Sequence, residues 1–329
     1  MRRGCDRWGH PWLALGLLLV LFAGGCGGCA SQKSGEVDQP PGDIEQGTLI
    51  EQLRAPSDLR KTYRPPTTEE YVRLTDLLTE FYADLLEGAT DFDRFRDPFR
   101  EAGLRLQTVE RAGQTWVLLF EGGPKWRGTG VYAFRTGTDR REVILQAPHS
   151  YYDIHTGEIT EAIFQQTDAR AFFFNSLHRY RGATRLLAGN ETHPSDLSHD
   201  TTSYFQAILT EYLTHRPDAL VVQFHGYDRD SLRDRRVGVV LSDGSDNPAD
   251  HVRSAGGRLD GTVADWKVAI YGEETDDYGA TANAQGQWIR RFDHGRFLHV
   301  EMLREVRDRL EEGGPELEAV GEAIVGSDE

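Results

Sequence analysis

The sequence has very little cysteine. Only three of its 329 residues are cysteines, and Cys29 is the last of them. The chain beyond that point can therefore form neither a disulfide framework nor a thiolate metal site. Any metal ion bound there must be held by histidine, aspartate or glutamate.

Positive charge is also scarce. The 37 lysines and arginines are outnumbered by 53 aspartates and glutamates, which leaves a formal net charge of −16 at pH 7. A surface this acidic repels nucleic acid and anionic lipid headgroups. The charge balance therefore predicts no nucleic-acid partner.

The apolar run near the N-terminus, residues 12–23, is too short to span a bilayer comfortably. It follows three arginines and precedes small residues that end at Cys26, an order typical of a lipoprotein signal peptide. We expect residues 1–25 to be removed and Cys26 to be lipidated, with Cys29 as the weaker candidate. An ordinary secretory signal or an N-terminal anchor helix would show a similar pattern, and each alternative places the rest of the chain outside the cytoplasm.

Removal of residues 1–25 would take away three arginines and one aspartate, so the net charge would become −18. The chain would then be attached to the membrane by acyl chains at Cys26 and not by charge. We therefore expect a lipid-anchored protein of the cell envelope.

Three segments are expected after the signal peptide. Residues 26–66 are rich in Gly, Pro, Gln, Ser and acidic residues with little apolar periodicity, which predicts a flexible tether. Residues 67–312 are expected to form one α/β domain. Residues 313–329 are expected to be an acidic C-terminal tail.

The domain is expected to open with a helix and a β-meander. Thr67 and Glu70 have capping-box spacing, and apolar residues recur on one helical face, which predicts a helix over residues 68–86. Runs of β-branched and aromatic residues between Gly-rich turns then predict a β-meander over residues 104–135.

Short apolar runs follow at residues 142–146, 171–175 and 219–224, with a helical pattern at residues 201–214. Strands that are buried on both faces have this composition. The sequence therefore predicts an α/β fold with a mostly parallel or mixed central sheet flanked by helices. Later strands are expected within residues 265–272 and 296–302, before a helix near residues 303–310.

Two histidines follow strands of that sheet. His149 comes just after the strand at residues 142–146, and His225 just after the strand at residues 219–224. Sites in open α/β sheets form outside the carboxyl ends of strands, so we expect the two imidazoles to meet there. The plainer alternative is that each histidine only hydrogen-bonds a loop.

Asp153 lies four residues after His149. Two histidines and one carboxylate, with a fourth position left open, form the ligand set of a hydrolytic zinc site. We therefore predict Zn²⁺ bound by His149, Asp153 and His225. Glu158 or Glu161 is an alternative source of the carboxylate.

Metal-assisted hydrolysis also needs a general base. Glu301 lies near the end of the strand at residues 296–302 and has apolar neighbours that favour a raised pKa. We predict that it takes a proton from water and later protonates the leaving amine. Alternatively, Glu301 begins the final helix, where it would cap the helix or pair with Arg304.

These features resemble the zinc carboxypeptidase-like superfamily. The resemblance rests on "APH" followed by a carboxylate, a histidine at a later strand end, and a late strand with "VE" before a helix. Within the superfamily, "APHSYYDIHTGEITEAI" is most similar to bacterial N-formylglutamate amidohydrolases and phage poly-γ-glutamate hydrolases. The resemblance covers roughly residues 142–310. It implies a phosphorylase/hydrolase-like fold, one zinc and a glutamate base, with the residues in the roles given above.

The sequence departs from the zinc carboxypeptidases at one point. Those enzymes carry His-x-x-Glu, whereas the residue three after His149 is Tyr152, so the carboxylate has moved or has been replaced by Asp153. Zinc-dependent peptidoglycan amidases place their second ligand further into the following helix. Glu161 as ligand would place the chain closer to that branch.

Substrate contacts are expected after the strand at residues 171–175. In the carboxypeptidases an adjacent Asn and Arg bind the terminal carboxylate, so the resemblance implies Asn175 and Arg179, with Arg181 nearby, for this role. An arginine also suits an oxyanion, which gives Arg179 a catalytic role. The alternative for Arg179 is a solvated loop arginine paired with one of the many carboxylates.

Two polar segments offer further candidates. Residues 271–289 form a long irregular insertion between strands, in which Asn283 is a candidate for substrate binding. His193 and His199 lie in "HPSDLSHD" and have the residue type for a second metal, although a polar loop explains them equally well.

Together these features predict an exported lipoprotein with a zinc-dependent hydrolase domain. Its substrates are expected to be amide bonds in peptides or amino-acid derivatives, with cell-wall peptide as one candidate. Two other functions stay open. A peptidoglycan amidase predicts Glu158 or Glu161 as a ligand, and a non-catalytic envelope binding lipoprotein predicts that Glu301 is dispensable.

Overall fold

The computed structural model describes residues 47–54, 63–111, 113–121, 127–182, 185–187, 190–263 and 265–326. All of them belong to one compact unit, residues 38–329. The predicted signal peptide, the lipidation site Cys26 and most of the predicted tether lie outside the described residues.

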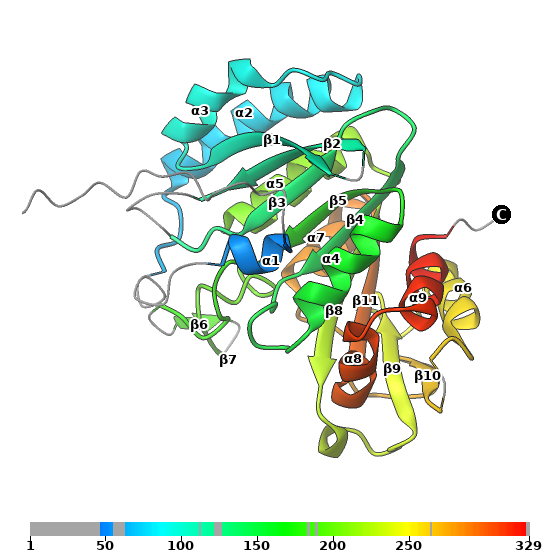
Figure 1. Ribbon diagram of the computed structural model, residues 1–329. Helices are drawn as coiled ribbons and strands as arrows, with labels where there is room; N and C mark the ends of the chain where they lie inside the picture. Colours follow the sequence, from blue (N-terminus) through cyan, green and yellow to red (C-terminus); the bar gives the residue numbers. More distant parts are fainter. Residues whose placement is uncertain are drawn as a thin grey trace, which may run out of the picture. The chain divides into compact units, whose positions relative to one another are not determined.

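A mixed nine-stranded sheet forms the centre of the described part of the chain (Figure 1). Its strands lie side by side in the order β1 (Arg105–Arg111), β2 (Gln114–Phe120), β3 (Val131–Arg135), β5 (Ala169–Phe174), β4 (Arg141–Ala147), β8 (Leu220–Tyr227), β11 (Arg296–Leu303), β9 (Val237–Ser242) and β10 (Lys267–Ile270). Strands β1, β2 and β3 are the antiparallel meander, and β3 pairs antiparallel with β5. Strands β5, β4, β8 and β11 run parallel, whereas β9 runs antiparallel to β11. The predicted α/β class and the mixed sheet are confirmed.

Helices cover both faces of this sheet. One face packs against α2 (Thr68–Leu86), α3 (Arg96–Glu101), α5 (Tyr204–His215) and α7 (Ala284–Phe292). The other packs against α1 (Leu49–Gln52), α4 (Thr156–Gln166), α6 (Asp250–Leu259), α8 (Arg304–Glu311) and α9 (Pro315–Val325). Short 3₁₀ turns lie at Asp93–Phe95 and Arg229–Ser231, and a small hairpin joins β6 (Arg185–Leu187) to β7 (Asn190–Thr192).

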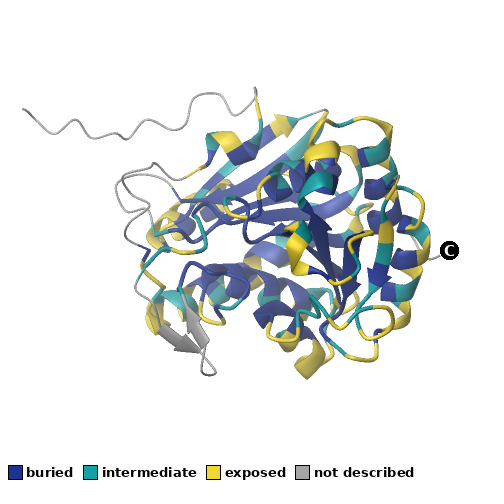
Figure 2. Ribbon diagram, turned by 90° about the horizontal axis from the view of Figure 1, so that it is seen from below, coloured by how far each residue is buried: buried dark blue, intermediate teal, exposed yellow. Residues whose placement is uncertain are grey.

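The sheet is buried on both faces because its side chains alternate between two cores. Along β2, Val117 and Leu119 belong to the core under α2, whereas Leu118 and Phe120 belong to the core on the opposite face. The central strands are buried along most of their length (Figure 2). This explains why their sequences read as continuous apolar runs.

The predicted helix at residues 68–86 is confirmed with these bounds. The Thr67 side chain accepts the N–H of Glu70, and the Glu70 side chain accepts the N–H of Thr67, so the predicted capping box forms. The buried face of α2 centres on Phe81, whose ring lies 5.3 Å from that of Phe99 in an edge-to-face contact.

Two predicted boundaries are wrong. The tether was expected to reach residue 66, but α1 is packed against α4, and Leu49 and Ile50 are buried. Their N–H groups donate to the carboxylate of Glu161 at 2.7 and 3.1 Å. This buried carboxylate replaces the hydrogen-bond partners that so short a helix cannot supply at its own N-terminus.

The acidic tail expected at residues 313–329 is wrong for Pro315–Val325, which is helix α9. Leu317, Val320 and Ile324 recur at helical spacing and are buried, while Glu318 and Glu322 are exposed. The many acidic residues of this segment led to the prediction of a tail, although its apolar residues have the spacing of an amphipathic helix. Among the described residues, no helix is long and apolar enough to cross a membrane.

Replacing Glu161 by alanine should lower the free energy of unfolding by about 1–3 kcal/mol, because two buried N–H groups lose their acceptor. Denaturant unfolding measures this change, with the exposed Glu51→Ala as the control. Zinc content of the purified chain should not change. Wild-type stability would contradict the anchoring role, and loss of zinc would restore Glu161 as a ligand.

Glu121 predicts a pH-dependent stability. Its carboxyl group is buried and accepts the N–H groups of Arg127, Gly128 and Thr129 at 2.9, 2.6 and 3.1 Å. Burial nevertheless raises the pKa of Glu121 from 4.5 to about 7. The proton is thus bound more tightly in the folded chain, so this stabilisation is complete below pH 4.5 and is lost as the pH rises through about 7.

A Glu121→Gln variant keeps an acceptor oxygen but does not ionise. Its free energy of unfolding relative to wild type should therefore rise between pH 5 and pH 8, by up to about 3 kcal/mol. Denaturant unfolding of both chains at the two pH values measures this difference. An equal difference at both pH values would contradict the raised pKa.

Candidate metal centre

The carboxyl ends of β4, β8 and β11 meet at one edge of the sheet. Gln146 of β4 lies opposite Gln223 of β8, and Glu301 of β11 lies opposite His225 of β8. His149 follows β4 by two residues. The expectation that the two histidines meet is therefore confirmed. Glu301 lies within a strand and does not begin the final helix.

The turn after β4 brings His149 and Asp153 together. The N–H groups of Tyr152 and Asp153 both donate to the carbonyl of His149, at 2.7 and 2.9 Å, so the backbone makes one helical turn. Residues four apart share a face of such a turn. His155 then adopts a left-handed conformation, with φ of 71°, before α4 begins. Asp153 is consequently buried beside His149, whereas Tyr152 is 43% exposed.

Three ligand atoms form a compact triangle. Nδ1 of His149 lies 3.0 Å from Nδ1 of His225 and 3.2 Å from Oδ2 of Asp153, and the third side, from His225 to Asp153, is 3.5 Å. Zinc bonds of about 2.0–2.1 Å in a tetrahedral site require ligand atoms about 3.3 Å apart. The three distances bracket that value, so these residues fit a zinc ion, and all three are buried.

Hydrogen bonds on the far side of each ring orient the two imidazoles. Nε2 of His149 lies 2.9 Å from Oδ1 of Asp196, and Nε2 of His225 lies 2.9 Å from Oε1 of Gln223. Both partners are acceptors, so each Nε2 carries a proton and each Nδ1 is the nitrogen left to bind a metal when its ring is neutral. Two Nδ1 atoms at 3.0 Å cannot both present bare lone pairs to each other, so either a metal ion or a proton on one ring lies between them.

The pKa shifts favour the metal-binding form of two of the three side chains. Burial lowers the pKa of His225 to about 4, so its ring is neutral. Burial acts to raise the pKa of Asp153, but His149 and His225 outweigh it and hold the pKa well below its usual range. A neutral imidazole and an ionised carboxylate are the forms that bind a metal. At His149, burial and Arg179 act to lower the pKa, but the carboxylates of Asp196 and Asp153 outweigh them and raise it, so a metal would have to displace a proton from this ring.

Asp196 connects the triangle to the loop that follows β7. Besides His149, its carboxylate contacts Nδ1 of His199 at 3.1 Å, the hydroxyl of Ser198 at 2.9 Å and the guanidinium of Arg179. Burial acts to raise the pKa of Asp196, but these partners hold it well below the usual range. A carboxylate behind a metal-binding histidine fixes the ring and increases its basicity.

Glu301 and His299 line the same space from β11. Oε1 of Glu301 lies 3.6 Å from Nε2 of His299, and the His299 ring packs against that of His225 with centroids 4.6 Å apart. Burial raises the pKa of Glu301 well above its ordinary value and lowers that of His299 well below it. The predicted effect of apolar surroundings on Glu301 is therefore present. His225, His299 and Glu301 form a second cluster of buried metal-binding side chains beside the triangle.

Arg307 of α8 holds the segments that carry these groups. It donates to the carbonyls of Met302 at 3.1 Å, Ile154 at 2.5 Å and Tyr227 at 3.2 Å. These carbonyls belong to β11, to the turn after β4 and to the end of β8. Gly226 leaves room for this side chain, because a Cβ atom there would lie 2.4 Å from the guanidinium carbon.

A pocket of about 340 Å³ opens onto the triangle. The described residues around it include the three proposed ligands and Tyr152, Arg179, Ser198, His199, Gly226, Tyr278, Ala280, Thr281, Ala282, Asn283, His299 and Glu301. The fourth coordination position of a tetrahedral ion would face this space. Glu158 and Glu161 are not among these residues, so neither alternative ligand reaches the triangle.

Of the residues predicted to contact substrate, two line the pocket and two do not. Arg179 and Asn283 line the pocket, although the amide of Asn283 is bound to Gln223 and to the N–H of Gly286. The prediction for Asn175 is wrong, because its side chain is fully buried and bonds the Ser195 carbonyl and the Leu177 N–H, both at 2.9 Å.

Arg181 also does not line the pocket, and its backbone N–H donates to the hydroxyl of Ser195. His193 contacts the carbonyl of Gly182, and His199 contacts Asp196, so the structure does not bring these two histidines into one cluster. The plain reading of "HPSDLSHD" as a polar loop holds for His193.

Asp196, Ser198 and Gln223 were not predicted as site residues. Asp196 lies between His193 and His199 in "HPSDLSHD", a segment for which only the two histidines were considered as ligands. Gln223 lies two residues before His225 on the same strand and hence on the same face of the sheet. That spacing was available from the sequence.

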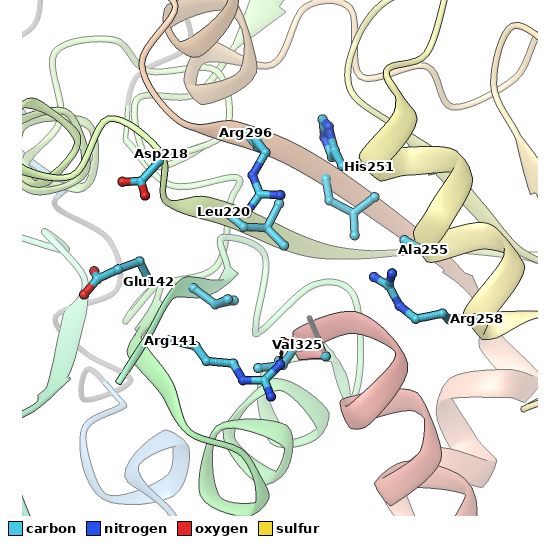
Figure 3. Close-up of a pocket in the computed structure, with 12 residues that line it drawn as sticks. Arg141, Glu142, Asp218, Leu220, His251, Ala255, Arg258, Arg296 and Val325 are labelled. Carbon is cyan, nitrogen blue, oxygen red and sulfur yellow. Dashed lines mark hydrogen bonds between the residues drawn. The ribbon is translucent and has the colours of Figure 1, made fainter. Parts of the chain in front are cut away.

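A second cavity, of about 430 Å³, lies at the opposite edge of the sheet, where β4, β8 and β11 begin (Figure 3). Arg141, Arg258 and Arg296 surround it together with His251 of α6. Arg141 and Arg258 donate to the carbonyls of Val325 and Ala323 at the end of α9. These arginines thus neutralise the C-terminus of a helix.

Comparisons with known proteins give the following matches. No known family description and no curated protein matches the sequence. Similar solved structures include the N-formylglutamate amidohydrolase of Ralstonia eutropha, with 13% identity, a TM-score of 0.37 and coverage of 56% of this chain and 93% of that one. A metallo-carboxypeptidase of Burkholderia cenocepacia has 12% identity, a TM-score of 0.38 and coverages of 68% and 75%. The succinylglutamate desuccinylase of Vibrio parahaemolyticus has 13% identity, a TM-score of 0.41 and coverages of 71% and 82%. The first two are proteins of the kinds that the sequence resemblance named.

The triangle predicts about one zinc ion per chain after loading with zinc and removal of excess. His149→Ala and His225→Ala should each abolish this binding, because a two-ligand site holds zinc weakly. Plasma mass spectrometry of the purified chain measures the metal. His251→Ala, which removes a histidine at the opposite edge of the sheet, is the control and should retain the ion. Equal zinc in all four proteins would contradict the site.

Proposed function

We propose that the chain is a zinc-dependent hydrolase that cleaves amide bonds in peptides or amino-acid derivatives. The observation that supports this most directly is that the open side of the ligand triangle and Glu301 line one pocket. His149, Asp153 and His225 would hold the metal. When bound, zinc supplies a Lewis acid that polarises a carbonyl and makes water more acidic.

Glu301 has the position and the environment of a general acid and base. It is buried at the end of β11 and lines the pocket, and its surroundings favour the protonated carboxyl. A group that binds a proton this readily can take one from water and return it to the leaving nitrogen. In the reaction, the oxygen of water bonds to the acyl carbon, the C–N bond breaks, and the amine nitrogen receives the proton.

Asp196, Gln223 and Arg307 act on the site through other groups. Asp196 and Gln223 hold the Nε2 protons of the two histidines, so the Nδ1 atoms stay directed at the metal position. Arg307 keeps the three strand ends at fixed separations. A hydrolytic site depends on such fixed geometry.

The cellular setting is proposed from the sequence alone. Residues 1–25 have the pattern of a lipoprotein signal peptide, so we propose an exported chain that is lipid-anchored at Cys26 in the cell envelope. Peptide substrates of that compartment include cell-wall peptide. The amidase alternative predicted Glu158 or Glu161 as a ligand, and the engagement of Glu161 with α1 argues against it.

Glu301→Gln should reduce kcat for amide hydrolysis by at least about a hundredfold, because the variant cannot accept a proton. Zinc content should stay near one ion per chain. The assay follows the release of primary amines from a mixed peptide pool by the zinc-loaded wild type and the variant. Retained activity in Glu301→Gln would favour a different base. A wild-type chain that binds zinc but cleaves nothing would favour the binding-protein alternative.

A further inference from the structure

The guanidinium of Arg179 is already paired. Arg179 is the one lysine or arginine among the described residues that line the pocket. Its Nε and Nη2 both donate to Oδ2 of Asp196, the former at 3.1 Å. Nη1 lies 3.1 Å from Nδ1 of His149, a contact that a metal on that nitrogen would replace, so the pairing with Asp196 is the one that persists. Asp196 is itself buried. A charge-assisted contact of this kind is strong and is little screened by solvent.

The other groups able to bind a carboxylate are engaged elsewhere. Arg307 is buried and donates to three backbone carbonyls. Asn175 is committed to the loop it stabilises, and Arg181 lies outside the pocket lining. The Asn and Arg pair implied by the resemblance therefore does not form a carboxylate clamp here.

The charges around the pocket already balance. Arg179 offsets Asp196, and a divalent ion at the triangle would offset Asp153 and the ionised form of Glu301, which is the form that acts as a base. A carboxylate on the substrate would enter a partly buried space without a positive partner, which is costly. The strongly acidic chain adds a repulsive field at longer range.

The remaining lining suits uncharged groups. Tyr152 and Tyr278 contribute aromatic side chains, and residues 280–282 are small. Tyr152, 43% exposed, also meets the 47% exposed Tyr180 edge to face, with ring centroids 4.9 Å apart. These exposed rings extend the pocket with a surface for neutral or aromatic portions of a ligand.

We infer that the pocket selects amides with no negative charge next to the scissile bond, such as internal peptide bonds and C-terminally amidated peptides. A free C-terminal carboxylate beside the bond is disfavoured, because the guanidinium that would bind it belongs to Asp196. The inference rests on the proposed hydrolase function and specifies its substrate class.

The test uses matched peptides. A set of short N-acetylated peptides is prepared with free and with amidated C-termini, and the zinc-loaded full chain is assayed on both by mass spectrometry. The amidated peptides should be cleaved at their last peptide bond faster than the free acids, because a free acid would place an unpaired carboxylate in the pocket. Equal rates, or faster cleavage of the free acids, would overturn the inference.

A binding measurement separates this inference from the proposed function. Zinc-loaded Glu301→Gln is titrated with the same two peptide sets by calorimetry. If the wild type cleaves neither set, the hydrolase proposal fails, and the binding preference alone decides the inference. Tighter binding of amidated peptides supports it, and tighter binding of free acids, or equal binding, overturns it.

Asp196→Asn removes the partner of Arg179 and should move the ratio of free-acid to amide cleavage, or of binding, toward the free acid by about tenfold. The ratio is used because Asp196 also orients His149, so both absolute rates will fall. Arg181→Gln is the matched control and should leave the ratio unchanged. An unchanged ratio in Asp196→Asn, with zinc retained, would overturn the inference.

Discussion

The structure of the site depends on one close contact, in which Nδ1 of His149 and Nδ1 of His225 face each other at 3.0 Å. Nδ1 of His149 and Nδ1 of His225 can both present lone pairs only if their opposite nitrogens donate, and Asp196 and Gln223 are the acceptors that ensure this. The close contact between the two Nδ1 atoms therefore requires a positive group between them, either a proton on His149, whose pKa is raised by Asp196 and Asp153, or a metal ion. Metal binding and the loss of that proton are thus coupled, and the affinity for a metal should rise with pH.

Keeping that arrangement requires polar groups inside an apolar sheet. Gln223 is fully buried, accepts from His225 and Asn283, and donates to Gln146 and Gln285. A buried amide is tolerated when its hydrogen bonds are made, and a network of such amides has few alternative geometries. The amide network therefore fixes the orientation of His225 from behind, while the parallel register of β4, β8 and β11 fixes its position. The positions of the metal-binding atoms are therefore fixed by buried groups in the core of the sheet.

The sequence predicted the parts of the site that follow from strand geometry. His149 and His225 follow apolar strands, and Glu301 alternates with apolar residues along a third, so a rule about strand ends was enough to bring them together. Asp196 was not assigned to the site, although it lies between His193 and His199, because its loop is placed by the hydrogen bond from Asn175 to the Ser195 carbonyl, twenty residues later, which no local pattern predicts. Helices α1 and α9 were missed because acidic and polar composition outweighed a short apolar periodicity. Asn175 was wrongly assigned to substrate binding because that role came from the resemblance alone. In the structure its buried amide hydrogen-bonds the Ser195 carbonyl and the Leu177 N–H, and so holds the loop after β5 in place.

The use of arginine connects the fold to the pocket. Arg135 and Arg170 are fully buried and donate to backbone carbonyls, as Arg307 does beneath the site and Arg141 and Arg258 do at the end of α9. In an acidic chain these guanidiniums link elements from within and leave the surface negative. Arg179 follows the same pattern, since it joins the loop after β5 to Asp196. Its charge therefore serves the stability of the site first, and a ligand that needs that charge must compete with a buried carboxylate for it.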